Sequence, residues 1–478
     1  MYWEDLPAHV TPSSRRGPLR LATKNLQKKN QNNMTIKVRF APSPTGFLHV
    51  GNIRAAIINY LYAKKTGGQF FLRLDDTDVE RVRDEYREMI LTDMNWLNLH
   101  YDLLFKQSDR LAKYEEAKNK LIANGRLYEC FETTEDLNFQ RKAQVASGIS
   151  PIYNRAALNL NPEQKQSLRA QGLKPHYRFL LEDKITSWDD KIKGKITYEG
   201  RHFSDPVLVR DNGVPTYTFC SVVDDVDYEI TDIIRGEDHI TNTAIQIQIF
   251  EALGAKSPNF SHLALVKASD GKISKREGGF DVKSLRNDGY EPMAIVNLLA
   301  QIGTSDQLKI HKDFDELVRD FDFSKFSKSA TNYDISELTT INQKLLQSLD
   351  FVAISKRLKE IGISEEISEK FWNSLKLNIS FLHELKEWIA ICNHEFRFEN
   401  KELDKEFLRE AASLLPQNTT DENCWNLWLN EIKKKTDRKG KDLFMPIRLA
   451  LSGKEHGPEL KFLVNLIERE EILKRLQN

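Results

Sequence analysis

The stretch that decides the fold is Arg39-Phe-Ala-Pro-Ser-Pro-Thr-Gly-Phe-Leu-His49-Val-Gly-Asn52. The apolar run that leads into it, residues 36–40, predicts a strand, and its two prolines and first glycine predict a loop. Beyond the second glycine, apolar residues recur at helical spacing. His49 and Asn52 should therefore stand at the start of a helix, where free backbone N–H groups attract phosphate.

A second strand is predicted over residues 69–74, and it ends in Asp75-Asp76-Thr77-Asp78. Strand, loop, helix and strand make a βαβ unit, whose ligands gather beyond the carboxyl ends of the strands. His49 with Asn52 and the cluster Asp75 to Asp78 both fall at that edge of the sheet.

Length and composition set wide limits. A chain of 478 residues should divide into about three domains. Lys plus Arg and Asp plus Glu number 70 each, so a nucleic-acid partner would be held by local basic patches. No apolar run approaches membrane-spanning length, and we expect a soluble protein. The four scattered cysteines indicate a reducing compartment rather than a disulfide framework.

Residues 1–33 are basic and aperiodic, and they predict a disordered extension with Met34 as the functional start. Enrichment in Arg and Ser would suit a mitochondrial transit peptide, whereas Glu4 and Asp5 oppose one. We therefore expect a cytoplasmic protein of bacterial type, with a mitochondrial location the less favoured alternative.

Further along, residues 111–205 interrupt the βα alternation with helices (112–124 is one) and polar loops. Strands are then predicted near 230–235 and 263–266, with a helix over 241–253 between them. The second of these strands enters a charged segment that ends in Gly278-Gly279, which marks a loop. The pattern from 281 onward is helical, including 379–389 and 460–476.

Three segments carry a family resemblance: the opening stretch, Leu72-Arg-Leu-Asp-Asp-Thr-Asp78, and Lys272-Ile-Ser-Lys-Arg276. Together they resemble the signature motifs of class I aminoacyl-tRNA synthetases, in the form found in glutamyl-tRNA synthetases. Residues 443–458 resemble the terminal segment of the bacterial enzymes, so that the similarity runs from Met34 to near the end.

The resemblance implies an α/β fold: a Rossmann-like parallel-sheet catalytic domain with an inserted acceptor-binding domain, followed by an all-α C-terminal anticodon-binding region. The expected divisions are the extension (1–33), the first catalytic half (34–110), the inserted acceptor-stem-binding domain (111–205), the second catalytic half with the Lys272–Arg276 loop (206–280), a stem-contact helical domain (281–345) and the all-helical anticodon-binding domain (346–478).

Amino-acid activation joins a carboxylate to the α-phosphate of ATP, and it gains most from positioning and from neutralising phosphate charge. The resemblance implies His49, Lys272 and Lys275 as the catalytic residues. The ATP-binding residues that it implies are His49, Gly51, Asn52, Lys272, Ser274, Lys275 and Arg276. In isolation such a charged loop would only face water.

The glutamate-binding residues implied by resemblance are Arg39, Ser43, Asp75, Tyr217, Ser221 and Arg235. A guanidinium such as that of Arg39 can hold a carboxylate by two parallel hydrogen bonds, and Asp75 would pair with the α-ammonium. Core packing is the alternative for Tyr217, and turn formation is the alternative for the aspartates. Three residues depart from the common family pattern, because Asn52 replaces a His, Asp75 replaces a Glu and Ser221 replaces an Asn.

Some family members bind zinc in the inserted domain, but this sequence offers only Cys130 there. Tetrahedral zinc needs four ligands, so no metal site is predicted. ATP with Mg²⁺ is expected, with L-glutamate and tRNA(Glu) as partners, no membrane contact and a monomeric state. A basic run either faces water or contacts the anticodon arm. It comprises Lys433, Lys434, Lys435, Arg438, Lys439 and Lys441.

The predicted function is that of a glutamate–tRNA ligase, which forms glutamyl-adenylate and transfers the amino acid to tRNA(Glu). The nearest alternative charges tRNA(Gln), alone or in addition. A truncated relative that glutamylates a tRNA base lacks the helical end region. A simple nucleotidyltransferase would not need the Lys272–Arg276 loop, and a silent RNA-binding paralogue would not need His49, Lys272 and Lys275.

Overall fold

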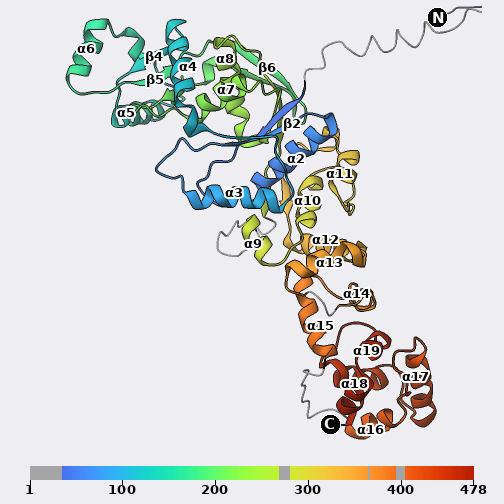
Figure 1. Ribbon diagram of the computed structural model, residues 1–478. Coiled ribbons are helices and arrows are strands. Elements are labelled where there is room, and N and C mark those ends of the chain that lie inside the picture. The colour runs from blue at the N-terminus through green and yellow to red at the C-terminus, as the bar shows by residue number, and fades with distance from the viewer. Residues whose placement is uncertain (1–34, 269–279, 364–366, 394–403, 478) are drawn as a thin grey trace, which may run out of the picture.

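The computed structural model describes residues 35–268, 280–363, 367–393 and 404–477. An α/β part occupies one end of an elongated molecule, and a column of helices leads away from it to the C-terminus (Figure 1). Within the described ranges no helix is both long enough and apolar enough to cross a membrane.

The first half of the central sheet is a parallel βαβ unit. Strand β1 (Lys37–Phe40) pairs with β2 (Gln69–Leu74), and β2 pairs with β3 (Leu103–Lys106), in both cases parallel. Helix α2 (Val50–Thr66) connects the first two strands and buries ten of its residues, because it is apolar on most sides. Helix α3 (Asp84–Trp96) connects β2 to β3.

The second half adds two more parallel strands, β9 (Asp232–Gly236) and β10 (Asn259–Leu263). The three-stranded sheet (β1, β2, β3) and the two-stranded sheet (β9, β10) meet where the Thr231 N–H donates to the Lys37 carbonyl over 3.0 Å, which sets β9 beside β1. Helices α7 (Tyr217–Asp227) and α8 (Ile240–Ala252) belong to this half. The carboxyl ends of these strands share one edge, as the sequence indicates.

The strand predicted over 263–266 is wrong. Strand β10 ends at Leu263, and a separate strand, β11 (Val266–Ala268), pairs with β12 (Thr331–Tyr333) instead. The apolar run is continuous in sequence, but the Ala264 carbonyl accepts a hydrogen bond of 2.9 Å from Arg54. That carbonyl is therefore satisfied by a side chain and not by a neighbouring strand.

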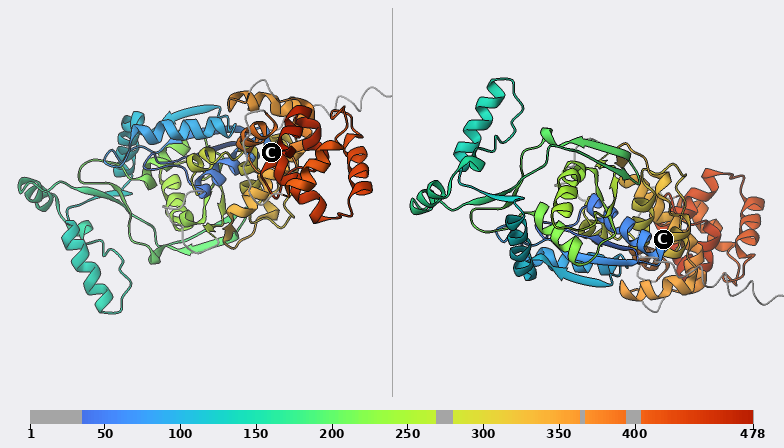
Figure 2. Two further views of the ribbon diagram at one scale, coloured as in Figure 1. Left: turned by 90° about the horizontal axis from the view of Figure 1, so that it is seen from below. Right: turned by 90° about the horizontal axis from the view of Figure 1, so that it is seen from above.

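The interruption between the halves carries its own antiparallel sheet and a hairpin. The sheet has the order β4 (Leu127–Cys130), β5 (His176–Phe179), β8 (Val207–Val209), and the hairpin joins β6 (Ile185–Asp190) to β7 (Gly194–Glu199). Its helices are α4 (Leu111–Ala123), α5 (Thr134–Ala146) and α6 (Pro162–Ala170). Helices α5 and α6 bury no residue, and Figure 2 shows them projecting from the body.

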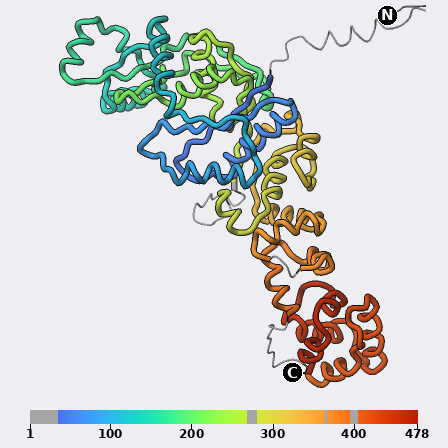
Figure 3. Tube along the Cα trace, in the orientation of Figure 1, coloured from blue at the N-terminus to red at the C-terminus, as the bar shows by residue number. Residues whose placement is uncertain are grey.

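The rest of the chain is mainly helical, and Figure 3 traces it away from the sheet. Its α-helices are α9 (Val282–Asn287), α10 (Pro292–Gln301), α11 (Phe314–Asp320), α12 (Ile335–Ser348), α13 (Phe351–Glu360), α14 (Glu369–Leu375), α15 (Leu385–Cys392), α16 (Lys405–Ser413), α17 (Cys424–Lys435), α18 (Lys441–Ser452), α19 (Leu460–Leu466) and α20 (Arg469–Gln477). The 3₁₀ turns of the chain are η1 (Gln107–Arg110), η2 (Ala156–Asn159), η3 (Gly200–His202), η4 (Glu237–His239), η5 (Phe323–Lys325) and η6 (Leu382–Glu384).

Two predicted helices differ in extent. The helix predicted over 460–476 is broken, because Ile467 has an extended backbone and its side chain is buried in the C-terminal core. The helix predicted over 379–389 begins later, at η6, and continues as α15. In both places the apolar spacing is real, but it does not fix where a helix begins or where it breaks.

Candidate active site

A cavity of about 220 Å³ lies at the carboxyl ends of the central strands. It is bounded by residues from β1, the start of α2, β9 and the segment that follows β10. The predicted site residues that line it are Arg39, His49, Gly51, Asn52, Tyr217 and Arg235. Residues more than 180 positions apart in sequence thus share one cavity.

His49 is the N-cap of α2. Its Nδ1 accepts hydrogen bonds from the backbone N–H groups of Gly51 and Asn52, over 3.1 and 3.3 Å. In the neutral imidazole the proton therefore sits on Nε2, which makes that atom a donor. Gly51 permits this cap, because a Cβ there would lie 3.0 Å from the imidazole Cε1. A donor at a helix N-terminus suits an anionic ligand.

The predicted loop residues Lys272, Ser274, Lys275 and Arg276 lie outside the described residues. Their flanks are described. Val266, in β11 before the loop, lines the cavity. After the loop, the Val50 N–H donates to the Phe280 carbonyl and the Val282 N–H donates to the Leu48 carbonyl, each over 3.0 Å. The upstream flank thus lies at the cavity, and the downstream flank is hydrogen-bonded to the neighbours of His49.

Arg39 and Asp75 belong to a buried network of charges. Arg39 donates to Asp225 from Nε (3.1 Å) and from Nη2 (3.3 Å). Arg73 bridges Asp225 (2.9 Å) and Asp75 (2.6 Å). Burial raises the pKa of Asp75 to about 6, although Arg73 acts to lower it. Asp224 completes the acidic side of the network, where it also accepts from Arg110 over 2.7 Å.

Arg235 has a different environment. Only 6% of it is exposed, and its partners are neutral: Nη1 donates to the Tyr217 hydroxyl (3.2 Å), and Nη2 donates to Thr243 and Gln246 (2.7 Å each). Its Nε is buried without a hydrogen-bond partner, and no carboxylate of the described chain forms an ion pair with it. Burial lowers its pKa. A buried cation of this kind is costly until an anion joins it.

Tyr217 separates this cavity from a second hollow of about 100 Å³ and lines both. Ser43 and Asp75 line the second hollow. The residues predicted to bind glutamate are therefore divided between two adjacent spaces. Ser221 lines neither space; it is fully buried, its hydroxyl donates to the Tyr217 carbonyl (2.8 Å), and it accepts from Gln246 (2.8 Å).

Several residues that line the two cavities were not predicted as site residues, and three of them carry ionisable groups close to the predicted ones. Asp238 and His239 line the first cavity, and Arg210 lines the second. The pKa of His239 is lowered to about 4 by burial and by Arg235. Glu237-Asp-His239 stands directly after β9, so its position at a strand end was the available signal.

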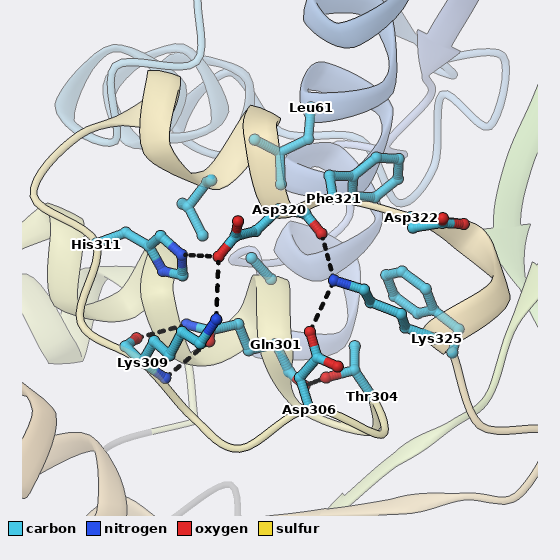
Figure 4. Close-up of a pocket in the computed structure, with 13 residues that line it drawn as sticks. Leu61, Gln301, Thr304, Asp306, Lys309, His311, Asp320, Phe321, Asp322 and Lys325 are labelled. Atoms are coloured by element: carbon cyan, nitrogen blue, oxygen red, sulfur yellow. Dashed lines mark hydrogen bonds and ion pairs between the residues drawn. The ribbon is translucent and has the colours of Figure 1, made fainter.

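Another cavity, of about 30 Å³, lies between α2, α10 and α11 and is drawn in Figure 4. Its polar side chains pair with one another: His311 contacts Asp320 over 3.0 Å, and Lys325 contacts Asp306 over 2.7 Å (Figure 4). It has room for about one water molecule. We assign it to the structural framework of this region.

A group that the sequence did not reveal lies in the antiparallel sheet. Cys130 faces His176 across β4 and β5, and their ligand atoms lie within 4.8 Å of one another and of Glu132. The Tyr153 hydroxyl donates to Glu132 (2.6 Å) and lies 3.7 Å from the Cys130 sulfur, while Arg178 donates to His176 (3.3 Å). One carboxylate oxygen of Glu132 is buried without a partner.

These residues offer three ligands where tetrahedral zinc needs four. Burial raises the pKa of the Cys130 thiol to about 12, and the adjacent Arg178 guanidinium would repel a cation. The donor set therefore fits zinc poorly, and the absence of zinc stays a prediction.

The basic run extends from the last turn of α17 to the first residue of α18. Lys433, Lys434 and Lys435 form the last turn of α17, where they suit the negative end of the helix dipole. Arg438 pairs with Asp404 and lies 4.2 Å from the centre of the Phe407 ring. At least Arg438 thus has a packing role.

Comparisons with known proteins agree with this geometry. Residues 35–340 match the family described as tRNA synthetases class I (E and Q), catalytic domain, and residues 343–478 match the anticodon binding domain family. The chain is 51% identical to glutamate–tRNA ligase 1 of Rickettsia massiliae over 92% of this chain and 98% of that one. It is 50% identical to glutamate–tRNA ligase 1 of Rickettsia felis over 92% and 99%.

A crystal structure of a glutamate tRNA ligase from Elizabethkingia meningosepticum, in complex with its amino acid, is 27% identical with a TM-score of 0.81, covering 93% of this chain and 98% of that one. Both halves of the cavity and the helical end region fall within the matched families. The chain therefore belongs to the glutamate–tRNA ligases of the class I tRNA synthetase family.

Proposed function

We propose that this chain activates L-glutamate with ATP to glutamyl-adenylate and transfers the glutamyl group to the 3′ end of tRNA(Glu). The observation that carries the proposal is the buried Arg235 guanidinium, which lines the cavity together with His49 and whose hydrogen-bond partners among the described residues are all neutral. A substrate carboxylate would supply the missing negative charge.

Arg235 and Arg39 give the cavity its selectivity for an acidic amino acid. A carboxylate bound by a guanidinium in a buried site gains charge-assisted hydrogen bonds, whereas the neutral side-chain amide of glutamine gains less. Asp75, in the adjacent hollow, would meet the α-ammonium group. Tyr217 lines both spaces and would separate the two ends of the substrate.

The phosphates of ATP would lie at the N-terminus of α2. The Nε2 proton of His49 and the backbone approach at Gly51 favour an oxyanion there. Lys272, Ser274, Lys275 and Arg276 would reach the same phosphates from anchors beside His49. Mg²⁺ would enter with ATP and screen the phosphate charge.

For tRNA we propose the division expected from the sequence: residues 111–205 contact the acceptor end, 281–345 the stem and 346–478 the anticodon. The projecting helices α5 and α6 and the match of 343–478 to an anticodon binding domain support this division. We propose a monomer that acts in the cytoplasm.

The decisive experiment is glutamate-dependent exchange of pyrophosphate into ATP, measured with and without tRNA(Glu). We expect exchange that requires tRNA, as the family resemblance implies, and no exchange with glutamine in place of glutamate. Absence of exchange in both conditions would end the proposal. Charging of purified tRNA(Glu) against tRNA(Gln) then separates the proposed substrate from its alternative.

A further inference from the structure

A line of hydrogen bonds leads from Arg235 into the protein interior, on the side covered by Thr243. Arg235 Nη2 donates to the Thr243 hydroxyl over 2.7 Å, that hydroxyl contacts His262 Nε2 over 2.9 Å, and His262 Nδ1 contacts Asp190 Oδ2 over 2.5 Å. All four residues are more than nine-tenths buried. None of the last three lines the cavity, and Thr243 contacts two residues that do: it accepts from Arg235, and its hydroxyl lies 3.2 Å from the His239 carbonyl.

The four residues come from four different elements. Arg235 and His262 stand opposite one another on β9 and β10, and Thr243 belongs to α8. Asp190 ends β6, in the segment that interrupts the catalytic halves. The Lys191 N–H donates to the Phe260 carbonyl over 3.1 Å, which holds this hairpin against β10.

Asp190 determines which atom donates and which accepts in the hydrogen bonds between His262, Thr243 and Arg235. Its Oδ1 accepts the backbone N–H groups of Lys193 (2.9 Å), Ile192 (3.0 Å) and His262 (3.2 Å), so the carboxylate is fixed and stabilised as an anion. An anion beside Nδ1 keeps the ring proton on that atom. The lone pair of Nε2, at 2.9 Å, is then the nearer acceptor for the Thr243 proton, and the His239 carbonyl, at 3.2 Å, is the more distant one. With its proton directed to Nε2, the hydroxyl oxygen faces Arg235.

The neutral form of His262 matters to the same geometry. Burial lowers its pKa, so the ring next to Arg235 carries no second positive charge. Nη2 also donates to Gln246 (2.7 Å) and to the His239 carbonyl (3.5 Å). Arg235 is thereby held by neutral oxygens, while its Nε–H has no partner in the described chain.

We propose that Asp190, His262 and Thr243 are positioning residues that orient Arg235 for the side-chain carboxylate of glutamate. This inference rests on the proposed function, because it concerns the substrate of that site. It also gives the inserted hairpin a part in amino-acid selection, through Asp190.

The first test replaces Thr243 by Val, which keeps the shape and removes the acceptor. Losing a hydrogen bond to a charged group should raise the KM for glutamate by about tenfold to a hundredfold, with kcat and the KM for ATP nearly unchanged. Thr243→Ser keeps the hydroxyl and should restore the KM. Thr241→Val, at an exposed position of the same helix, is the matched control and should match the wild type.

The wild-type protein separates the two possible failures. If it shows no glutamate-dependent exchange, the proposed function is wrong. If it activates glutamate and Thr243→Val retains the normal KM, or raises the KM for ATP equally, the positioning role is wrong.

The second test reads the His262 tautomer directly by ¹⁵N NMR of the full chain. Wild-type His262 should carry its proton on Nδ1. Asp190→Asn places an amide N–H against Nδ1, so that the proton should move to Nε2 and the KM for glutamate should rise with it. An unchanged tautomer, or a changed tautomer with an unchanged KM for glutamate, would overturn the proposed positioning role of Asp190 and His262. Should Asp190→Asn fail to fold, the Thr243 pair decides alone.

Discussion

The two halves of the catalytic sheet bury their arginines in opposite ways. Near β1 and β2, Arg39 and Arg73 are held by Asp75 and Asp225, in a network whose members are almost fully buried. Near β9 and β10, Arg235 is equally buried but is held by two hydroxyls and an amide.

We propose that the difference separates a cation that serves the fold, Arg73, from one that serves a ligand, Arg235. Carboxylates close to Arg73 outweigh its burial and raise its pKa, so that its charge is fully compensated inside the protein. The pKa of Arg235 is lowered, because burial is not compensated. A protein tolerates this second arrangement where the missing charge arrives with a substrate.

The largest effect should come from Arg235→Met. Truncating one member of a buried charge pair costs about 4 kcal/mol, so the KM for glutamate should rise about a thousandfold. The free energy of unfolding should stay equal or increase slightly, because an unpaired buried cation is removed. The kinetics of pyrophosphate exchange measure the KM for glutamate, and urea unfolding measures the free energy of unfolding. A large loss of stability would place Arg235 with the structural arginines instead.

Asp225→Asn should instead reduce the stability of the fold. Asp225 pairs with both Arg39 and Arg73, so its neutralisation leaves two buried cations poorly compensated and should lower the free energy of unfolding by about 3 kcal/mol. The control on the same helix is Asp227→Asn, whose carboxylate is 41% exposed and pairs with Arg110. That exposed pair should contribute less than about 1 kcal/mol. Equal losses of unfolding free energy in the two variants would contradict the proposed difference between the buried and the exposed ion pairs.

The smallest effect concerns pH. In the proposed site Asp75 binds the α-ammonium group in its ionised form, and its pKa of about 6 lies above the usual Asp value. Glutamate binding should therefore be fully present well above pH 6 and weaken as pH falls through it, so that kcat/KM at pH 5 is about tenfold below that at pH 7. Asp75→Asn should start lower and remain flat over this range. If kcat/KM of the wild type and of Asp75→Asn fell equally with pH, the titration would belong to another group.

Much of this organisation could be predicted from local sequence. The βαβ unit, the position of His49 at a helix start and the helical end region all follow from apolar spacing and from glycine and proline placement. The errors at 263–266 and 460–476 arose where an apolar run passed through a turn, because periodicity does not say which neighbour takes the backbone hydrogen bonds.

What sequence alone determined here is the set of chemical groups and their order along the chain, because those depend on residue type and short-range spacing. Only the tertiary structure decided which buried arginine received a carboxylate. It also decided that Asp190 reaches His262, that Cys130 meets Glu132 and His176, and that Ser221 turns away from both cavities. Such contacts join elements far apart in the chain, and their distances are fixed by packing rather than by any local pattern.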